Sequence, residues 1–418
     1  MNILLKSATI LDEENRGLHQ KVRDIWIRNG IIEKIAASIK ADSKTKVITL
    51  PNLHVSKGWI DSSVSFGEPG YEERETLANG IRVAAYSGFT DIILNPNTKP
   101  LPDTSGDVVF LKKTAGEKGA RVHPMGTLTM NSAGTDLAEL YDMKNAGAVA
   151  FYDFKRPLMN ANLLKIALQY AQGFDGLVLS FPMDTSIAAH GVVNEGTMST
   201  KLGLKGIPAL SEEIQIARDL FILEYTGGKL HIPTISTANA VNLIAEAKKK
   251  GLDVSCSVAL HNLCFTDNVL EEFETNYKVL PPLRTRKDIE ALKKGLKNGT
   301  IDLVTTDHLP IDIEEKRIEF DHAAFGSLGL ESAFGVLNSL FDTETAIRLL
   351  SRGRERFAVP TTSIKEGEPA NLSLFNPEGK VVFTKENIRS TSKNSMFIGQ
   401  KGKGSVYGVF VNNQFILS

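Results

Sequence analysis

Polar side chains that could do chemistry follow a short apolar run near the start of the sequence. Ser63 and Ser65 come just after a run expected to be a buried strand, Val55 to Ile60. Alternate residues of a strand point to the same side, so both hydroxyls are expected to face one direction. A serine nucleophile would need a general base within reach and an oxyanion hole. Because the sequence has no Gly-x-Ser-x-Gly elbow, a serine hydrolase is disfavoured.

Other polar residues lie directly after later apolar runs. They are Asn97, Tyr152, Asp153, Ser180, Thr234, His261, Asp307 and His308. A hydrolytic zinc site needs three or four ligands drawn from imidazole, carboxylate or thiolate, with a position open for water. The set offers the carboxylates of Asp153 and Asp307 and the imidazoles of His261 and His308. We favour a structural role for the two histidines, which leaves too few ligands.

The two carboxylates could have either a functional or a structural role. Asp153 and Asp307 could form an acid/base pair or hold a hard cation such as Mg²⁺. In the structural role, which we favour, Asp307 caps backbone N–H groups in its loop. Asp153 then pairs with a nearby cation, Lys155 or Arg156.

Strands and helices that would position these groups alternate through the middle of the chain. Beyond Val55 to Ile60, the expected strands are residues 87–94, 122–128, 146–151, 176–179, 229–232, 252–258 and 301–305. Expected helices are residues 71–86, 136–145, 161–170, 211–225, 238–250 and 286–297. Short apolar strands alternating with helices predict a parallel sheet covered on both faces. Eight such units fit a (β/α)₈ barrel, which carries its functional groups after the carboxyl ends of the strands.

The two ends of the chain have a different pattern, with short strands separated by turns. For the middle of the chain, the alternative fold is a doubly wound open sheet. That fold would carry a glycine-rich phosphate turn after its first strand, and Gly58 to Gly70 is not such a turn. We predict three segments: residues 1–53 and 346–418, which together build one small β-sandwich domain, and residues 54–345, which form the barrel.

Composition excludes several functional classes. The 418 residues carry a net charge of −1, so no global field favours nucleic acid or an anionic membrane. No run of apolar residues is long enough to span a membrane, and the start lacks a secretory signal. Cys256 and Cys264 are expected to be reduced structural thiols. These features predict a cytoplasmic protein.

Several motifs across nearly the whole chain resemble dihydroorotase, a cyclic amidohydrolase, of the bacterial and multifunctional-complex type. They include Asn95-Pro-Asn-Thr-Lys-Pro100, Pro281-Pro-Leu-Arg284, Thr306-Asp-His308 and Gly329-Leu-Glu331. The segment Gly58 to Gly70 also has the frame of that family's first metal-binding motif. The resemblance implies an α/β fold, an amidohydrolase TIM barrel with a β domain from both chain ends, and a homo-oligomer.

The departures from the family pattern fall on the residues that bind metal and substrate in the family. The family's metal-binding histidines match Ser63, Ser65, Ser180 and Thr234, whereas its metal-binding carboxylate matches Asp153. The general base matches Asp307. Among the substrate-binding positions Asn97 is kept, and the others have become Gly67, Leu280 and Ile311. The resemblance therefore implies that the family's zinc is absent and that no cofactor is needed.

We expect a catalytically inactive dihydroorotase homologue of pyrimidine biosynthesis that acts as a structural or regulatory partner. Inactive dihydroorotase-like chains of the family associate with aspartate transcarbamoylase, which makes that enzyme the expected partner. The alternative is an active dihydroorotase that interconverts N-carbamoyl-L-aspartate and dihydroorotate with an atypical metal site. A third alternative is a small-molecule sensor using the vacated pocket. Phe66, Phe154 and Phe181 lie beside the lost positions and predict a partly apolar, plugged mouth.

Overall fold

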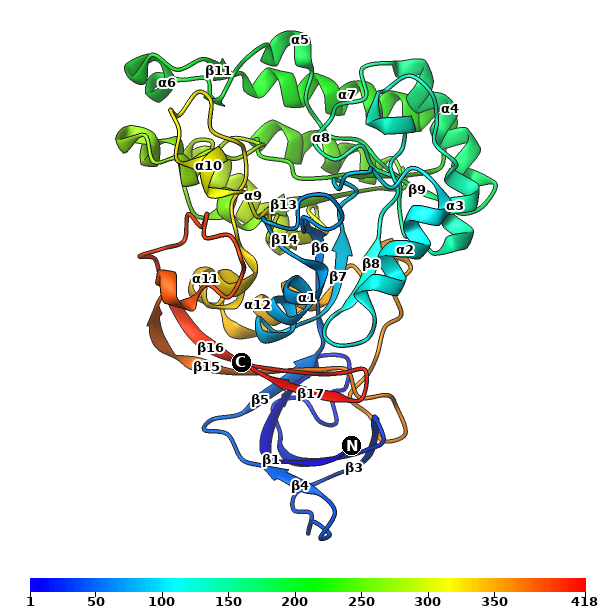
Figure 1. Ribbon diagram of the computed structural model, residues 1–418, viewed down its shortest axis with the longest axis vertical. Helices are drawn as coiled ribbons and strands as arrows, with labels where there is room; N and C mark the ends of the chain where they lie inside the picture. Colours follow the sequence, from blue (N-terminus) through cyan, green and yellow to red (C-terminus); the bar gives the residue numbers. More distant parts are fainter.

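The computed structural model describes residues 1–418 and shows a ring of strands and helices standing on a separate β-sheet (Figure 1). The strands of the ring fall into two parallel groups. The first comprises β6 (Trp59–Val64), β7 (Phe89–Leu94) and β8 (Arg121–Pro124). The second comprises β9 (Leu177–Leu179), β12 (Lys229–Ile232), β13 (Val254–Ala259) and β14 (Leu303–Thr305). Every residue of β6, β7 and β13 is buried, as expected when both faces of a parallel sheet are covered.

Three isolated backbone bridges close the ring. Phe151 pairs with Gly126 on one side and Val178 on the other, so it stands in for the fourth strand. Val64 pairs with His308 and joins the first strand to the end of the last. The predicted barrel is confirmed, but the fourth strand is not a regular one. Of its expected residues 146–151, only Phe151 makes strand bridges, and Ala146 belongs to helix α3 (Leu140–Ala146).

The first expected strand was wrong in its extent. The chain forms two strands here, β5 (His54–Lys57) and β6, which belong to different sheets. Gly58 separates them at a crowded point, where an added Cβ would lie 2.1 Å from Thr90 Oγ1 and 2.7 Å from Asn371 Oδ1. Ser63 therefore lies within the barrel strand, and Ser65 directly follows it.

Helices surround the barrel, and side chains at their N-termini cap the free backbone N–H groups of the first turn. Thr104 with Asp107, and Thr285 with Asp288, form capping boxes at two of them. The longer helices are α1 (Leu77–Tyr86), α2 (Ser105–Ala115), α3, α4 (Ala161–Gln172), α7 (Ala209–Thr226), α8 (Ala238–Lys249), α9 (Arg286–Asn298), α11 (Ala333–Leu340) and α12 (Thr343–Ser351). Shorter elements in the loops are α5 (Thr185–Ala188), α6 (Thr197–Leu202), α10 (Ile313–Lys316), β10 (Val193–Asn194) and β11 (Gly206–Ile207). None of the helices combines the length and the apolar character needed to cross a bilayer.

Both ends of the chain build one sheet, as the sequence predicts. Its strands are β1 (Asn2–Leu11), β2 (Val22–Arg28), β3 (Ile31–Ala36), β4 (Lys46–Ile48), β5, β15 (Leu372–Val382), β16 (Lys401–Val411) and β17 (Gln414–Leu417). They follow the order β17-β16-β15-β5-β1-β2-β3, with β4 beside β1. The sheet has its own apolar core, which includes Ile3, Ile25, Val55 and Phe410.

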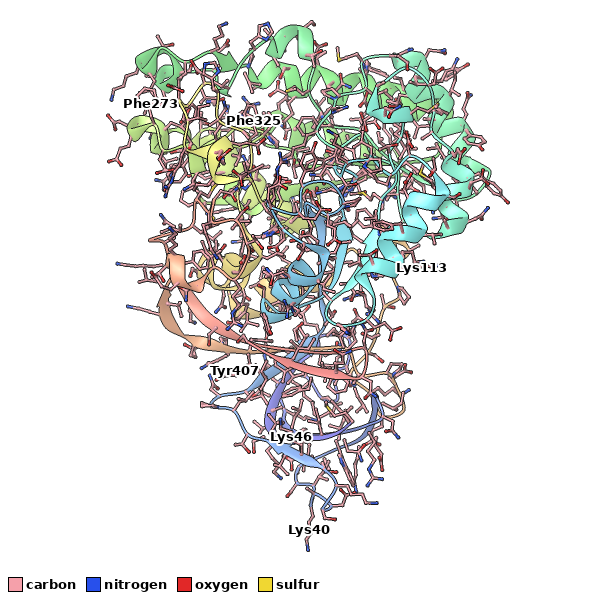
Figure 2. The ribbon with its side chains drawn as sticks, in the orientation of Figure 1. Lys40, Lys46, Lys113, Phe273, Phe325 and Tyr407 are labelled. Atoms are coloured by element: carbon pink, nitrogen blue, oxygen red, sulfur yellow. The ribbon has the colours of Figure 1, made fainter.

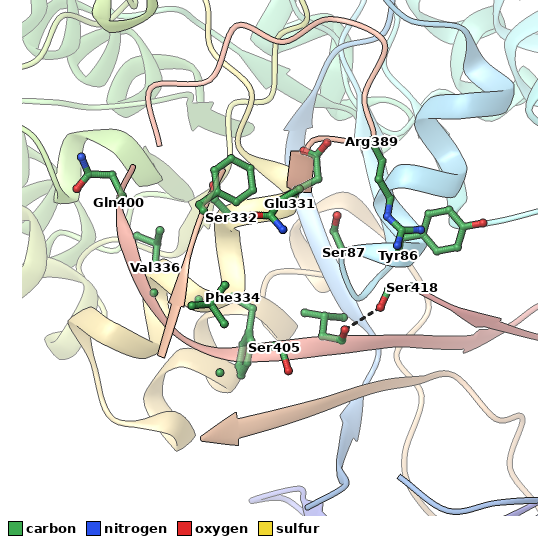
Figure 3. Close-up of a pocket in the computed structure, with 17 residues that line it drawn as sticks. Tyr86, Ser87, Glu331, Ser332, Phe334, Val336, Arg389, Gln400, Ser405 and Ser418 are labelled. Atoms are coloured by element: carbon green, nitrogen blue, oxygen red, sulfur yellow. Dashed lines mark hydrogen bonds between the residues drawn. The ribbon is translucent and has the colours of Figure 1, made fainter. Parts of the chain in front are cut away.

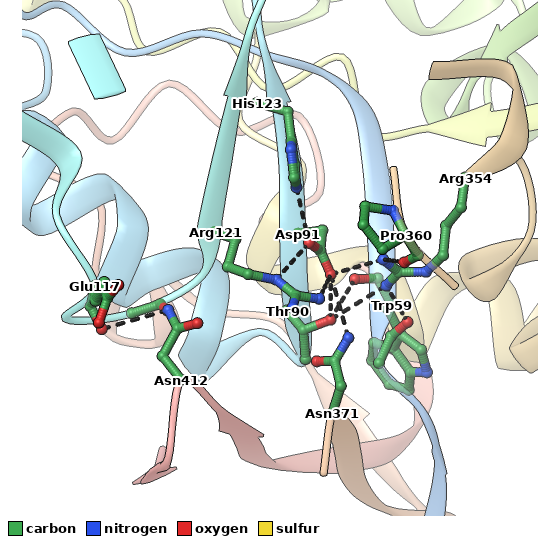
Figure 4. Close-up of polar contacts among 12 residues, drawn as sticks. Trp59, Thr90, Asp91, Glu117, Arg121, His123, Arg354, Pro360, Asn371 and Asn412 are labelled. Atoms are coloured by element: carbon green, nitrogen blue, oxygen red, sulfur yellow. Dashed lines mark hydrogen bonds and ion pairs between the residues drawn. The ribbon is translucent and has the colours of Figure 1, made fainter. Parts of the chain in front are cut away.

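The buried carboxylate of Asp91 links the barrel to the segment between α12 and β15, through which the chain returns to this sheet (Figure 4). Asp91 of β7 accepts hydrogen bonds from Arg354 and Arg121, each at 2.8 Å, and lies 2.8 Å from His123 Nε2. Arg354 also donates to the carbonyl of Gly58 at 2.6 Å. Burial alone would raise the pKa of Asp91, but the contacts with His123, Arg354 and Arg121 outweigh it and lower that pKa.

Candidate functional site

Ser63 and Ser65 lie on the same side of the chain, as the alternating pattern predicts. The Asn95 side chain donates to Ser63 Oγ at 3.1 Å and to Ser65 Oγ at 3.0 Å. Asn95 directly follows β7, so the rule that functional groups follow strand ends could have identified it. The two hydroxyls are thus held as neutral hydrogen-bonding groups at the end of the barrel.

The main charged feature at this end of the barrel is an ion pair between Lys155 and Asp307. Lys155 Nζ lies 2.6 Å from Asp307 Oδ2, and Ser63 Oγ donates to Asp307 Oδ1 at 3.2 Å. The two side chains of the pair are only 10% and 3% exposed. Burial raises the pKa of Asp307, whereas the Lys155 ammonium and the Ser63 hydroxyl oppose that rise. The expectation that Asp307 caps backbone N–H groups was therefore wrong.

Asp153 has the capping role that was expected of Asp307. Its carboxylate accepts hydrogen bonds from the N–H groups of Leu128 and Thr129, at 2.9 and 3.0 Å, and from the Thr129 hydroxyl at 2.5 Å. Burial raises its pKa, and these hydrogen bonds oppose the rise. The expected pairing of Asp153 with Lys155 or Arg156 was wrong, because Lys155 reaches Asp307 and Arg156 donates to backbone carbonyls.

The two other hydroxyl residues singled out in the sequence, Ser180 and Thr234, lie apart from the ion pair in their contacts. Ser180 Oγ donates to Asp219 Oδ2 at 2.6 Å, and Arg218 binds the other oxygen of Asp219 at 2.7 Å. Sequence reasoning missed Asp219, although a carboxylate on the buried side of α7 signals a partner. Thr234 is buried with φ 41°, a conformation that is rare for a β-branched residue. The backbone at residue 234 keeps an unusual turn without a metal-ligating side chain.

His261 and His308 are buried and poorly suited to carry a positive charge. Burial, assisted by the nearby charge of Lys155, lowers the pKa of His261 to about 3. Burial lowers the pKa of His308 to about 4. His308 Nδ1 accepts from the N–H groups of Gly329 and Leu330, whereas Nε2 of both histidines is shielded from solvent without a protein partner.

The residues at this end of the barrel do not fit a zinc ion. No group of three or more His, Cys, Asp or Glu side chains is placed to hold a metal. Asp307 is bound by an ammonium and Asp153 is bound by backbone N–H groups, so neither presents a free carboxylate. Neutral hydroxyls at residues 63, 65, 180 and 234 are poor substitutes for imidazole.

Apolar side chains extend from the barrel interior toward the same end. Phe181, Leu280 and Tyr152 belong to one buried cluster, against which Phe154 and Phe325 pack. Figure 2 labels Phe325 at the end of the molecule far from the terminal sheet. The expected apolar mouth therefore involves Phe154 and Phe181. Phe66 has a different position, because its ring packs over Gly80 of α1, where a Cβ would lie 2.3 Å from it.

The three positions that depart from the family's expected substrate contacts are crowded or buried. A Cβ on Gly67 would lie 1.7 Å from the carbonyl oxygen of Tyr71, so the backbone itself occupies the space an arginine would need. Leu280 and Ile311 are buried, at 8% and 5% exposure. Asn97, in contrast, has a side-chain oxygen that is shielded from solvent and has no protein partner.

A cavity of about 190 Å³ lies elsewhere, between α1, α11 and β16 (Figure 3). Glu331 and Phe334 line it, together with Arg389, whose guanidinium stacks on the ring of Tyr86. None of the predicted site residues at the barrel end contributes to this cavity.

Comparisons with known proteins agree with one another. Residues 53–240 match the family described as dihydro-orotase-like. The dihydroorotase of Pelotomaculum thermopropionicum is 38% identical, over 100% of this chain and 99% of that protein. The dihydroorotase of Syntrophus aciditrophicus is 36% identical over the same shares. Among solved structures, the L-hydantoinase (dihydropyrimidinase) from Arthrobacter aurescens superposes with a TM-score of 0.84 at 21% identity, covering 100% of this chain and 97% of that one. That structural likeness confirms the predicted fold, a (β/α)₈ barrel with a sheet built from both chain ends.

Proposed function

Because the chain belongs to the dihydroorotase family, we propose that it is a dihydroorotase homologue of pyrimidine biosynthesis that has lost the hydrolytic reaction. Its role is then that of a structural or regulatory partner, with aspartate transcarbamoylase as the partner we propose. The proposal includes a cytoplasmic location and a chain that needs no zinc or other cofactor.

The observation that carries this proposal is the ion pair between Lys155 and Asp307. A metal-dependent hydrolase needs the Asp307 carboxylate free, either to accept a proton or to face a metal-bound water. Here the carboxylate is bound at 2.6 Å by an ammonium and at 3.2 Å by a hydroxyl. A fixed ammonium supplies the positive charge beside Asp307 that a divalent cation would otherwise supply, but it provides no open coordination position for water. The chain's own lysine thus stabilises the site in a non-hydrolytic form.

The closed substrate positions give independent support. Interconversion of N-carbamoyl-L-aspartate and dihydroorotate requires recognition of an anionic substrate. The backbone around Gly67 leaves no room for an arginine, and Leu280 and Ile311 are apolar. A buried apolar side chain cannot compensate a carboxylate, so binding such a substrate would leave its charge unpaired.

An active dihydroorotase is the second candidate, favoured by full-length identity of 34–38% to dihydroorotases and by the retained Asp153, Asp307 and Asn97. Turnover by this chain would require Lys155 to leave Asp307. A steady-state assay in both directions, with and without added Zn²⁺, separates the two candidates: we expect no turnover under either condition.

The partner proposal has its own experiment. A tagged chain is purified from its native host and the copurifying proteins are identified by mass spectrometry, with the chain deleted in a parallel strain. We expect aspartate transcarbamoylase in the purified complex and a smaller transcarbamoylase assembly in the deletion strain. A chain that purifies alone, with the transcarbamoylase assembly unchanged by its deletion, would contradict the partner proposal.

A further inference from the structure

The outer face of α7 carries a stripe of exposed apolar side chains. Leu210 and Ile214 are 51% and 42% exposed, and Phe221 and Tyr225 are 68% and 79% exposed. Their spacing places all four on one side of the helix, with the small side chain of Ala217 between them. Scattered exposed apolar residues are ordinary, but a continuous stripe with two largely exposed aromatic rings is not.

The neighbouring helix α4 lies beside α7 but does not extend the stripe. Its exposed residue Tyr170 points away from α7 and packs against Phe174, which in turn contacts Tyr141 of α3. The side chain of Gln172 donates to the carbonyl of Thr226 at 3.1 Å, which joins the carboxyl ends of the two helices. Figure 1 shows both helices at the end of the molecule opposite the terminal sheet, so no part of that sheet reaches them.

The exposed apolar area is about that of the central part of a stable interface. An aromatic side chain offers on the order of 200 Å², so Phe221 and Tyr225 together present roughly 300 Å². Leu210 and Ile214 bring the apolar total of the stripe to roughly 450 Å². A standard interface takes about 800 Å² from each partner, part of it from a polar rim. The patch therefore matches the core of such an interface.

The order of the side chains along α7 is self-complementary. Leu210 and Tyr225 lie equally far from the point between Ala217 and Arg218, and so do Ile214 and Phe221. Two copies of the helix packed antiparallel about that point would place each aliphatic side chain against an aromatic one. The small Ala217 would lie at the crossing, where it permits the usual separation of about 8–10 Å between helix axes. A two-fold interface requires this kind of self-complementarity.

We propose that α7 is a self-association surface, on which a second copy of this chain packs its own α7 antiparallel about a two-fold axis beside Ala217. The inference is independent of whether the barrel retains chemistry. It commits to a second copy, because a single different partner would not require the symmetric order of the stripe.

The first experiment measures mass in solution by analytical ultracentrifugation over a range of concentrations. We expect the full-length chain to form a dimer. Phe221→Glu places a charge in the centre of the interface and should weaken dimerisation by about 30-fold or more. Phe110→Glu is the matched control, because Phe110 on α2 is 47% exposed but lies outside the stripe. It should leave the dimer unchanged.

The second experiment tests the geometry by disulfide crosslinking. Ala217→Cys should form a crosslinked dimer on its own, because the axis brings the two copies of this position together. Leu210→Cys should not crosslink with itself, but it should crosslink when mixed with Tyr225→Cys. The natural thiols give little background, because burial raises the pKa of both Cys256 and Cys264 to about 12.

Three outcomes would overturn the proposal. One is a native chain that stays monomeric at all concentrations. Another is a dimer that Phe221→Glu does not weaken. The last is a dimer in which Ala217→Cys fails to crosslink, or in which Leu210→Cys crosslinks with itself, because either result requires another geometry. Occupation of the stripe only by a different protein would appear as the first outcome.

Discussion

The ammonium of Lys155 lies 2.6 Å from the carboxylate of Asp307, and both groups are nearly excluded from solvent. This pair lies at the carboxyl ends of the barrel strands, and it predicts a specific pattern of stability changes. Lys155→Met should lower the free energy of unfolding by about 3 kcal/mol, because it leaves a buried carboxylate without its partner. The double variant Lys155→Met with Asp307→Asn should recover most of that loss.

The control for this prediction is Lys229→Met, because Lys229 pairs with Asp175 at the surface. An exposed pair contributes about 0–1 kcal/mol, so this variant should remain close to the native stability. Chemical denaturation of the four proteins makes the comparison. Equal losses for Lys155→Met with and without Asp307→Asn would contradict the ion-pair account.

Gly67 should not tolerate any side chain. Gly67→Ala should lower the free energy of unfolding by at least ~2 kcal/mol, because its Cβ would overlap the carbonyl oxygen of Tyr71. Gly173→Ala is the matched substitution, since the nearest atom to that added Cβ is 3.5 Å away. It should change stability by no more than about 0.5 kcal/mol. Thermal or chemical unfolding of both variants checks the prediction. A Gly67→Ala variant with unchanged stability would show that residue 67 has room for a side chain.

The buried histidines predict how stability changes with pH. The folded pKa of His261 is about 3, below the ordinary value of 6.5, so the unfolded chain binds a proton first as the pH falls. Its contribution to stability is complete above pH 6.5 and is lost as the pH falls toward 3. Between pH 7 and pH 5, His261→Gln should therefore remove about 2 kcal/mol of the native pH dependence. Denaturant midpoints at the two pH values test this, and an unchanged dependence would place the ring in a wetter environment.

Asp91 predicts the strongest single effect away from the candidate site. Asp91→Asn should lower the free energy of unfolding by at least ~3 kcal/mol, because two buried or half-buried arginines lose their counter-ion. Asp253→Asn removes a carboxylate that pairs with Arg356 at the surface and should cost less than about 1 kcal/mol. A difference of less than 1 kcal/mol between the two variants would contradict the role of Asp91 in joining the barrel to the returning segment.

The architecture could be predicted from the sequence because runs of apolar residues mark the segments that are buried. Apolar runs such as Ile92-Ile-Leu94 identified barrel strands, since both faces of a parallel barrel are covered. The split at Gly58 was missed, because a run from Val55 to Ile60 looks the same whether it belongs to one sheet or two. Asp91 offered a signal that was not used: a carboxylate inside an apolar strand requires a buried partner.

The candidate site was predicted in its residues but not in their contacts. Ser63, Asp153 and Asp307 were identified from strand ends and from the family motifs, which fix where a residue lies along the chain. The partner of each carboxylate depends on the direction of a side chain. Lys155, whose backbone φ is 52°, binds Asp307 and not the nearby Asp153. A positive φ at a lysine has no signature in a single sequence.

We propose that this barrel no longer hydrolyses cyclic amides with a metal. The most direct test of this proposal is one measurement of turnover between N-carbamoyl-L-aspartate and dihydroorotate, made on purified full-length chain whose bound zinc is quantified in the same sample. The dihydroorotase of Pelotomaculum thermopropionicum, prepared in parallel, provides the reference. We expect substoichiometric zinc and no turnover above the rate without protein, even after zinc is added. Stoichiometric zinc with turnover that is lost on chelation and restored by the metal would contradict it.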